Sequence, residues 1–280
     1  FMGISFNFVN VVVVPLLLSI LPPAMLAAKY VARIVEGKAA TLTVGGAVFV
    51  GSFVAPAVLA VGGWLSLELT GKQLPILPLL AAAAVSYVFG EGIGRLACLS
   101  FGCCYGKPTS SLPRWSQGIF RKIAITFHGE TKKICYAGGL EGVQVIPIQA
   151  ITSVIYSSLA LVGMYLFLSE HYAVALVGVF GASQCWRSLS EFLRGDFRGG
   201  RKISAYQIMA PVSALFAGLM TLAFHATSQP PIDLVHGVAT LWNPITLFTL
   251  QVVWLTTCLF TGWSKTTGGR VSFHVHRHRI

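Results

Sequence analysis

Residues 75–106 read PILPLLAAAAVSYVFGEGIGRLACLSFGCCYG, and this stretch decides the class of fold. Its first part is an apolar run that ends near residue 93, and a helix of that length can cross about 30 Å of hydrocarbon. Its second part, residues 90–106, overlaps the end of this run and contains five glycines, three cysteines, one acid and one base. Charged groups that close a membrane segment predict a polar site at its end as well as a span.

The composition extends this interpretation to the whole chain. Of 280 residues, 55% are hydrophobic and 10% are charged, whereas soluble domains have about 25% charged residues. We predict an all-α integral membrane protein, residues 1–280, in a single transmembrane domain. About seven transmembrane helices are expected, at residues 7–28, 44–66, 75–93, 147–168, 172–186, 205–225 and 240–262.

The longest connection, residues 107–146, contains the alternating sequence KIAITFHGETKKICYAGG. This pattern predicts a small hairpin or loop on the membrane surface. Nearly all of the 20 Lys and Arg residues follow the first, third, fifth and seventh expected spans. The positive-inside rule therefore places the N-terminus outside and residues 90–106 toward the cytoplasm.

The net charge of +11 suits cytoplasmic loops and anionic lipid. Basic residues are nowhere interleaved with stacking aromatic residues, so we expect no nucleic-acid partner. The six cysteines show no C-x-x-C spacing, and we predict that they pack as small apolar side chains. A redox switch or a soft-metal site at Cys103 and Cys104 remains an alternative, but the sequence places no third ligand beside them. We expect no metal and no cofactor.

Glu91 and Arg95 are four residues apart and share a helical face if the third span continues that far. Ionised groups at membrane depth usually line a cavity or meet a polar ligand. Gly94 and Gly106 permit close backbone approach, and exposed N–H groups beside an arginine can cradle a phosphate. The alternative is an interfacial ion pair that merely ends the helix.

Arg187, Glu191 and Arg194 have the spacing i, i+4, i+7. On one helix they would stack with the carboxylate between the guanidiniums, which it would hold toward an anion. A helix end whose charges simply reach the solvent is the alternative. Gln149 adds a polar group at the start of the fourth span.

Three segments, in this order, resemble the prolipoprotein diacylglyceryl transferase family. Residues 94–106 follow the register of its signature, G-R-x-G-N-F-x-N-x-E-x-x-G, in a cysteine-bearing form that ends in GCCYG. Residues 146–149 resemble its H-P-x-Q segment without the His. The family's late R-x-x-x-E-x-x-R helix is matched in full by Arg187, Glu191 and Arg194. The resemblance covers roughly residues 27–210.

The resemblance implies transfer of a diacylglyceryl group from phosphatidylglycerol to the cysteine thiol of a prolipoprotein, in a bacterial cytoplasmic (inner) membrane. It implies that Arg95 and Arg187 bind and polarise the lipid phosphate, which agrees with the need to hold negative charge where it forms. Glu191 would orient the guanidiniums. The predicted headgroup site also includes Glu91, Gly94, Tyr105, Gly106, Gln149 and Arg194.

Several positions depart from the family pattern, and four of them bear on the chemistry. The signature Asn and Glu are Cys98 and Cys103, the His of an H-G-G-L segment is Val44, and a tyrosine one turn before the late arginine is Ser183. Glu91 is then the buried acid left to accept a proton. The alternative function is a catalytically inactive relative, a lipid-binding or scaffold subunit of a larger membrane complex. The family's signature also faces the outside of the membrane, contrary to the charge distribution here, so the sidedness stays open.

Overall fold

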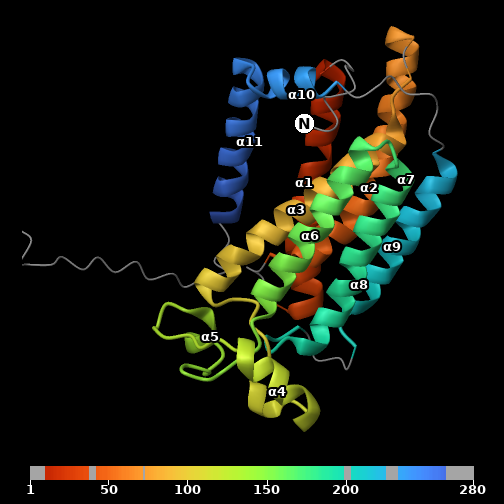
Figure 1. Cartoon of the computed structure of the whole chain (residues 1–280). Coiled ribbons are helices and arrows are strands. Elements are labelled where there is room, and N and C mark those ends of the chain that lie inside the picture. Colours follow the sequence, from red (N-terminus) through yellow and green to blue (C-terminus); the bar gives the residue numbers. More distant parts are fainter. Residues whose placement is uncertain (1–9, 38–41, 72, 199–202, 225–232, 263–280) are drawn as a thin grey trace, which may run out of the picture.

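The computed structural model describes residues 10–37, 42–71, 73–198, 203–224 and 233–262. Within these ranges the chain is helical and contains no strand, which confirms the all-α prediction. The long helices run up and down in a bundle, and a short-helix region closes one end (Figure 1). The principal elements are α1 (Asn10–Glu36), α2 (Val44–Thr70), α3 (Ile76–Phe101), α6 (Ile148–Leu168), α8 (Gly181–Ser190), α9 (Ala205–Ala223), α10 (Leu234–Leu241) and α11 (Pro244–Gly262).

Five described helices are long and apolar enough to cross a membrane, namely the end of α1 from Leu18 together with α2, α3, α6 and α9. A sixth candidate is the pair α10 and α11, which is bent by 63° at its break. The expected span at 172–186 is one continuous helical run, made up of α7 (Tyr172–Val174), a π-helix (Ala175–Phe180) and α8, because Ala175 and Gly181 at the junctions keep right-handed helical angles. Five or six candidate spans and this further helical run are thus described, which agrees with the expected number of about seven.

The core of the bundle lies where α3 packs against α6 and the π-helix. Small residues permit this contact. A Cβ atom on Gly92 would lie 3.0 Å from Ser157 Oγ, and one on Gly163 would lie 2.8 Å from Val85 Cγ2. Membrane helices gain most of their mutual attraction from such close packing. The apolar first half of α3 is accordingly the most buried of the candidate spans.

The start of α2 is fixed against two neighbours. Thr43 caps the helix, because its Oγ1 accepts a hydrogen bond from the N–H of Gly46 at 3.0 Å. Its own N–H donates to the carbonyl of Ala28 in α1 at 3.0 Å. A side chain on Gly45 would meet the ring of Tyr206 in α9, so the backbone of α2 lies directly on that ring. These contacts hold the first turn of α2 between α1 and α9.

Residues 107–146 form a compact loop region rather than a strand hairpin. The region contains a 3₁₀ turn (Thr109–Ser111), α4 (Arg114–Ile123) and α5 (Lys133–Tyr136), and Val145 forms isolated bridges with Pro108 and Ile125. The bridges follow the predicted alternation, but they do not extend into strands. A small apolar core of Tyr105, Phe127, Ile134 and Val145 holds the region together.

Helix α4 has the side-chain distribution of a helix that lies on a membrane. Trp115, Ile119 and Ile123 recur every four residues and are all exposed, and basic residues lie between them. An apolar stripe beside basic residues is typical of interfacial helices. The surface location of residues 107–146 stays a prediction that this pattern supports.

The basic loops gather at one end of the bundle. The end of α1, the 107–146 region and the segment after α8 all lie at the lower end in Figure 1, as alternation of the spans predicts. Lys38, Arg201, Lys202 and the basic C-terminal tail lie outside the described residues.

Candidate functional site

The ionic centre of the molecule combines two distant segments. Tyr87, Glu91 and Arg95 recur every four residues along α3, and Arg187 reaches them from α8. Glu91 forms ion pairs with both Arg95 and Arg187. The Tyr87 hydroxyl donates to Glu91, and Arg187 Nη2 donates to the Tyr87 oxygen at 2.8 Å. The predicted pairing of Glu91 with Arg95 and the convergence of Arg95 with Arg187 are therefore confirmed.

This centre is buried and only partly neutralised. The side chains of Glu91, Arg95 and Arg187 are 5%, 13% and 10% exposed. Two guanidiniums share one carboxylate, so the three groups carry a net positive charge. Among the described residues, moreover, the buried Nε–H groups of both arginines find no acceptor. Buried donors and charges without partners are costly, and an anion bound at this place would satisfy both.

An apolar cavity of about 410 Å³ opens beside the ionic centre. Tyr87 belongs to both, because its ring lines the cavity while its hydroxyl contacts Glu91 and Arg187. Val44, at the position of the family's His, also lines the cavity. The remaining lining is almost entirely apolar and comes from α1, α2, α3, the π-helix and α9. A hydrocarbon space that ends at a positive centre suits a ligand with an apolar body and an anionic head.

The second half of the predicted arginine set is arranged differently. Helix α8 ends at Ser190, so Arg194 does not continue the helical face of Arg187. Arg194 donates to both oxygens of Asp196 at 2.8 Å, and its Nη1 lies 3.7 Å from Glu191 Oε1. The prediction that Glu191 lies between Arg187 and Arg194 is wrong. Glu91 takes that position for Arg187, and Glu191 pairs with Arg194.

The structure also corrects the phosphate cradle that the glycines suggested. Gly94 lies within α3, where backbone N–H groups bond to the preceding turn, and it is on the exposed face. Gly106 is buried, and a Cβ atom there would collide with the carbonyl oxygen of Ile146. Its backbone forms a bridge with Arg194. Gly106 is therefore needed for close packing of the loop, and the N–H groups of α3 are already used.

Tyr105 and Gln149 likewise hold the loop. The Tyr105 side chain is buried in the core of the 107–146 region, and its carbonyl accepts from the N–H of Gly195 at 2.9 Å. Gln149 Nε2 donates to the carbonyl of Cys103 at 2.8 Å, and its Oε1 is buried without a partner among the described residues. Gln149 thus fixes the backbone of the signature from α6.

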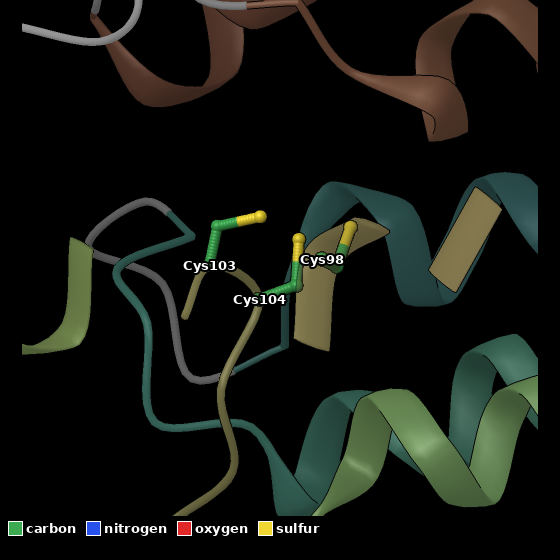
Figure 2. A group of neighbouring side chains, drawn as sticks. All are labelled: Cys98, Cys103 and Cys104. Carbon is green, nitrogen blue, oxygen red and sulfur yellow. The ribbon is translucent and has the colours of Figure 1, made fainter. Parts of the chain in front are cut away.

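Three cysteines meet at the end of α3. The Sγ atoms of Cys98, Cys103 and Cys104 all lie within 4.8 Å of one another. Figure 2 shows Cys98 on the helix and the other two on the loop that follows, with their sulfur atoms gathered in one space. The third ligand that the sequence did not place is Cys98. Thiol hydrogen bonds from Cys103 and Cys98, aided by the charges of Arg194 and Arg95, lower the pKa of Cys104 well below its usual value.

Tyr87, Asp196 and the place of Cys98 beside the other two thiols were not predicted from the sequence. The signal for Tyr87 was present, since it lies one turn before Glu91 on the same predicted helix. The signal for Cys98 was Gly102, because a glycine four residues later predicts a helix end that folds back on it. No sequence pattern linked Asp196 to Arg194.

A family model described as prolipoprotein diacylglyceryl transferase matches residues 10–224. The chain belongs to the prolipoprotein diacylglyceryl transferase family. The match spans α1 to α9 and contains the ionic centre, the cavity and the three cysteines. Comparison with curated proteins and with solved structures finds no match.

Membership of the diacylglyceryl transferase family makes the chain one of the membrane transferases of lipoprotein biosynthesis. The chemistry of that family is diacylglyceryl transfer from phosphatidylglycerol to a prolipoprotein cysteine, typically in the cytoplasmic membrane. The five or six candidate spans agree with an integral membrane protein.

Proposed function

We propose that this chain binds phosphatidylglycerol in a bacterial cytoplasmic membrane and transfers its diacylglyceryl group to a thiol. The observation that carries the proposal is the buried pair of guanidiniums with one carboxylate between them and two Nε–H donors free. A phosphodiester carries one negative charge, which matches the excess at this centre. Arginine is suited to this task because its planar donors match phosphate oxygens.

The adjoining cavity supports the same assignment. An acyl chain or part of the glyceryl group would occupy the apolar space of about 410 Å³ while the phosphate meets Arg95 and Arg187. The acceptor thiol releases its proton to solvent, and its sulfur attacks the glyceryl carbon that carries the phosphate. A C–S bond forms, the C–O bond breaks, and glycerol phosphate leaves with the electron pair. The guanidiniums stabilise the charge that develops on the leaving oxygen.

A second function is favoured by the residues at the family's reactive positions. Val44 cannot accept a proton, and Cys98 and Cys103 replace an amide and a carboxylate. With the arginines retained, the chain would hold a lipid as a subunit of a larger membrane complex without transferring any group. The two functions share the lipid site and differ only in turnover.

A lipid-binding experiment tests the lipid site that both proposed functions share. Purified full chain in detergent is titrated with phosphatidylglycerol or with zwitterionic phosphatidylcholine. We expect preference for phosphatidylglycerol, and a loss of at least tenfold in its affinity in both Arg95→Gln and Arg187→Gln. Arg121→Gln is the matched control, because Arg121 is an exposed guanidinium of α4. Equal affinity of all variants would remove the proposed site.

Turnover separates the two functions. Phosphatidylglycerol and a cysteine peptide are incubated with the protein, and mass spectrometry follows the diacylglyceryl peptide and released glycerol phosphate. We expect both products in equal amounts, and neither with Arg95→Gln. Tight lipid binding without either product, together with co-purification of other subunits, would favour the lipid-holding function.

A further inference from the structure

The three thiols at the end of α3 have the spacing of a metal site. Zinc binds thiolate sulfur at about 2.3 Å, which places the sulfur atoms of a tetrahedral site about 3.8 Å apart. The Sγ atoms of Cys98, Cys103 and Cys104 already lie within 4.8 Å of one another. Small rotations of the side chains would therefore bring them to bonding distance without moving the backbone.

The backbone turn builds this arrangement before any ion binds. Gly102 ends α3 with φ of 63°, and its N–H contacts the carbonyls of Cys98 and Leu99. The N–H of Cys103 returns to the carbonyl of Cys98 at 3.1 Å. These bonds form a Schellman motif, which folds Cys103 back over the last turn. Cys104 follows with φ of 55°, a conformation uncommon outside glycine and frequent at functional sites.

Two further contacts stabilise the thiol cluster. Gln149 fixes the Cys103 carbonyl from α6, so the loop cannot open freely. The guanidiniums of Arg95 and Arg194 act electrostatically on Cys104. Three thiolates and a divalent ion have a net charge of minus one, which nearby guanidiniums offset.

The number of potential metal ligands, which is three, indicates the kind of zinc site. Within the described residues no His, Asp, Glu or further Cys joins the three thiols. Structural zinc sites usually have four protein ligands, whereas catalytic sites have three and leave one position open. All three cysteines are partly exposed, so the open position can be reached from outside the bundle.

We propose that Cys98, Cys103 and Cys104 bind Zn²⁺, and that the open position of the ion binds the thiol of the acceptor. This proposal rests on the proposed transfer and names what would activate its acceptor. The bound acceptor thiol releases its proton to solvent and becomes a zinc thiolate. Its sulfur then attacks the glyceryl carbon, so that the Zn–S bond gives way to the C–S bond and glycerol phosphate departs.

The thiol cluster lies close to the ionic centre, where the transfer would take place. Arg95 lies one turn before Cys98 on α3, so the phosphate centre and the thiol cluster share one rigid helix. Val44 supplies no base, and a metal-bound thiol needs none near neutral pH because a coordinated thiol is deprotonated. The proposal takes up the soft-metal alternative at Cys103 and Cys104, adds Cys98 to it, and departs from the sequence predictions that the cysteines only pack and that no metal binds.

Metal binding is tested without reference to turnover. The purified full chain is loaded with Zn²⁺ and its metal content is measured after desalting. It is then loaded with Co²⁺, whose thiolate charge-transfer absorption reports the ligands. We expect one ion per chain and a thiolate spectrum, both lost in Cys98→Ser and Cys104→Ala. Cys185→Ser, which changes an exposed cysteine of α8, should retain both. Retention of the ion by the cluster variants would overturn the site.

Lipid binding by the cysteine variants serves as a control for folding in the metal-binding experiment. Each cysteine variant should still bind phosphatidylglycerol with unchanged affinity, because Arg95 and Arg187 are intact. Adding a cysteine peptide should shift the Co²⁺ spectrum of the wild-type chain, whereas the matching serine peptide should not. An unchanged spectrum would overturn the acceptor role. Transfer that continues in full after chelation of the metal would overturn the proposal and leave the transfer itself standing.

Discussion

Two arginine clusters lie at the same end of the bundle and differ in charge balance. In the first, Arg95 and Arg187 share the single carboxylate of Glu91. In the second, Arg194 pairs with the carboxylates of Asp196 and Glu191, and Arg198 also pairs with Asp196 at 3.1 Å. The first cluster therefore has an excess positive charge, and its two Nε–H groups have no acceptor among the described residues. In the second cluster the arginine charges are paired with carboxylates of the same chain. The comparison shows why a matching sequence motif does not give each of its arginines the same task.

The two clusters also differ in what they connect. Arg187 and Glu91 join two membrane helices, whereas Arg194 and Asp196 are two residues apart and fix the turn that packs on the signature loop. The backbone of Arg194 forms a bridge with Gly106 in that loop. We infer that the first cluster serves a ligand and that the second holds its surroundings in place.

Removal of the shared carboxylate should have the largest effect. Glu91→Gln leaves two buried guanidiniums without a counter-charge, and loss of one partner of a buried ion pair costs about 3–5 kcal/mol. We expect a fall of that size in the free energy of unfolding, measured by denaturant titration in detergent. Glu130→Gln, in the exposed loop, should leave stability unchanged. A stable Glu91→Gln protein would mean that the guanidiniums are satisfied in another way.

The second cluster should respond by a smaller amount. Asp196→Asn removes a charge that accepts two hydrogen bonds from Arg194, and a hydrogen bond to a charged group contributes about 1.5–3 kcal/mol. We expect a loss of about that size in stability, with unchanged affinity for phosphatidylglycerol. Weaker lipid binding in this variant would contradict the division between the two clusters.

The contribution of the Asp196 carboxylate to stability should depend on pH, and Asp196→Asn tests this. Burial alone would raise the pKa of Asp196, but the charges of Arg194 and Arg198 outweigh it and keep the pKa below its usual value. The carboxylate therefore stabilises the fold above the pKa that Asp196 has in the unfolded chain. This contribution is lost as the pH falls through the lower folded value. Wild type and Asp196→Asn should converge in stability on acidification, which unfolding curves at several pH values would show.

Tyr87→Phe should have the smallest effect and sharpens the role of the first cluster. It removes a hydroxyl that contacts Glu91 and Arg187 but keeps the ring that lines the cavity. We expect a loss of about 0.5–1.5 kcal/mol in stability, because both ion pairs remain. Lipid affinity should change less than in Arg187→Gln. A loss as large as in Arg187→Gln would indicate that the hydroxyl itself contacts the lipid.

The sequence was sufficient for the parts of the molecule that follow local periodicity. Apolar runs predicted the helices, and the spacing of four residues predicted the pair of Glu91 and Arg95. The assumption of an unbroken helix through Arg194 failed, because the chain turns into a 3₁₀ segment after Ser190. Which carboxylate meets Arg187 depends on packing between helices that are far apart in the chain. Such a contact leaves no periodic signal in one sequence.

The loop shows the same limit. Alternation in residues 122–139 indicated a hairpin or a loop, and a loop region forms in which Val145 makes two isolated bridges, with Pro108 and with Ile125. The glycines of the signature were interpreted as a cradle, yet Gly106 is required by the neighbouring backbone. A glycine in a sequence does not show which need it meets, because Gly106 permits a close backbone approach whereas nothing lies within 4 Å of a Cβ atom placed on Gly94.

The position of Glu91 one turn before Arg95 has a consequence for biosynthesis. An unpaired arginine costs about 2.5–3.5 kcal/mol on insertion at the centre of a membrane helix, and less toward the end of the helix, where Arg95 lies. Helix α3 carries its own counter-ion and can leave the translocon as a neutral pair. Arg187 lies in α8, which is synthesised later, when its partner Glu91 is already in the bilayer. The order of the helices along the chain thus lets the earlier segment act as an acceptor that draws the later one into the bundle.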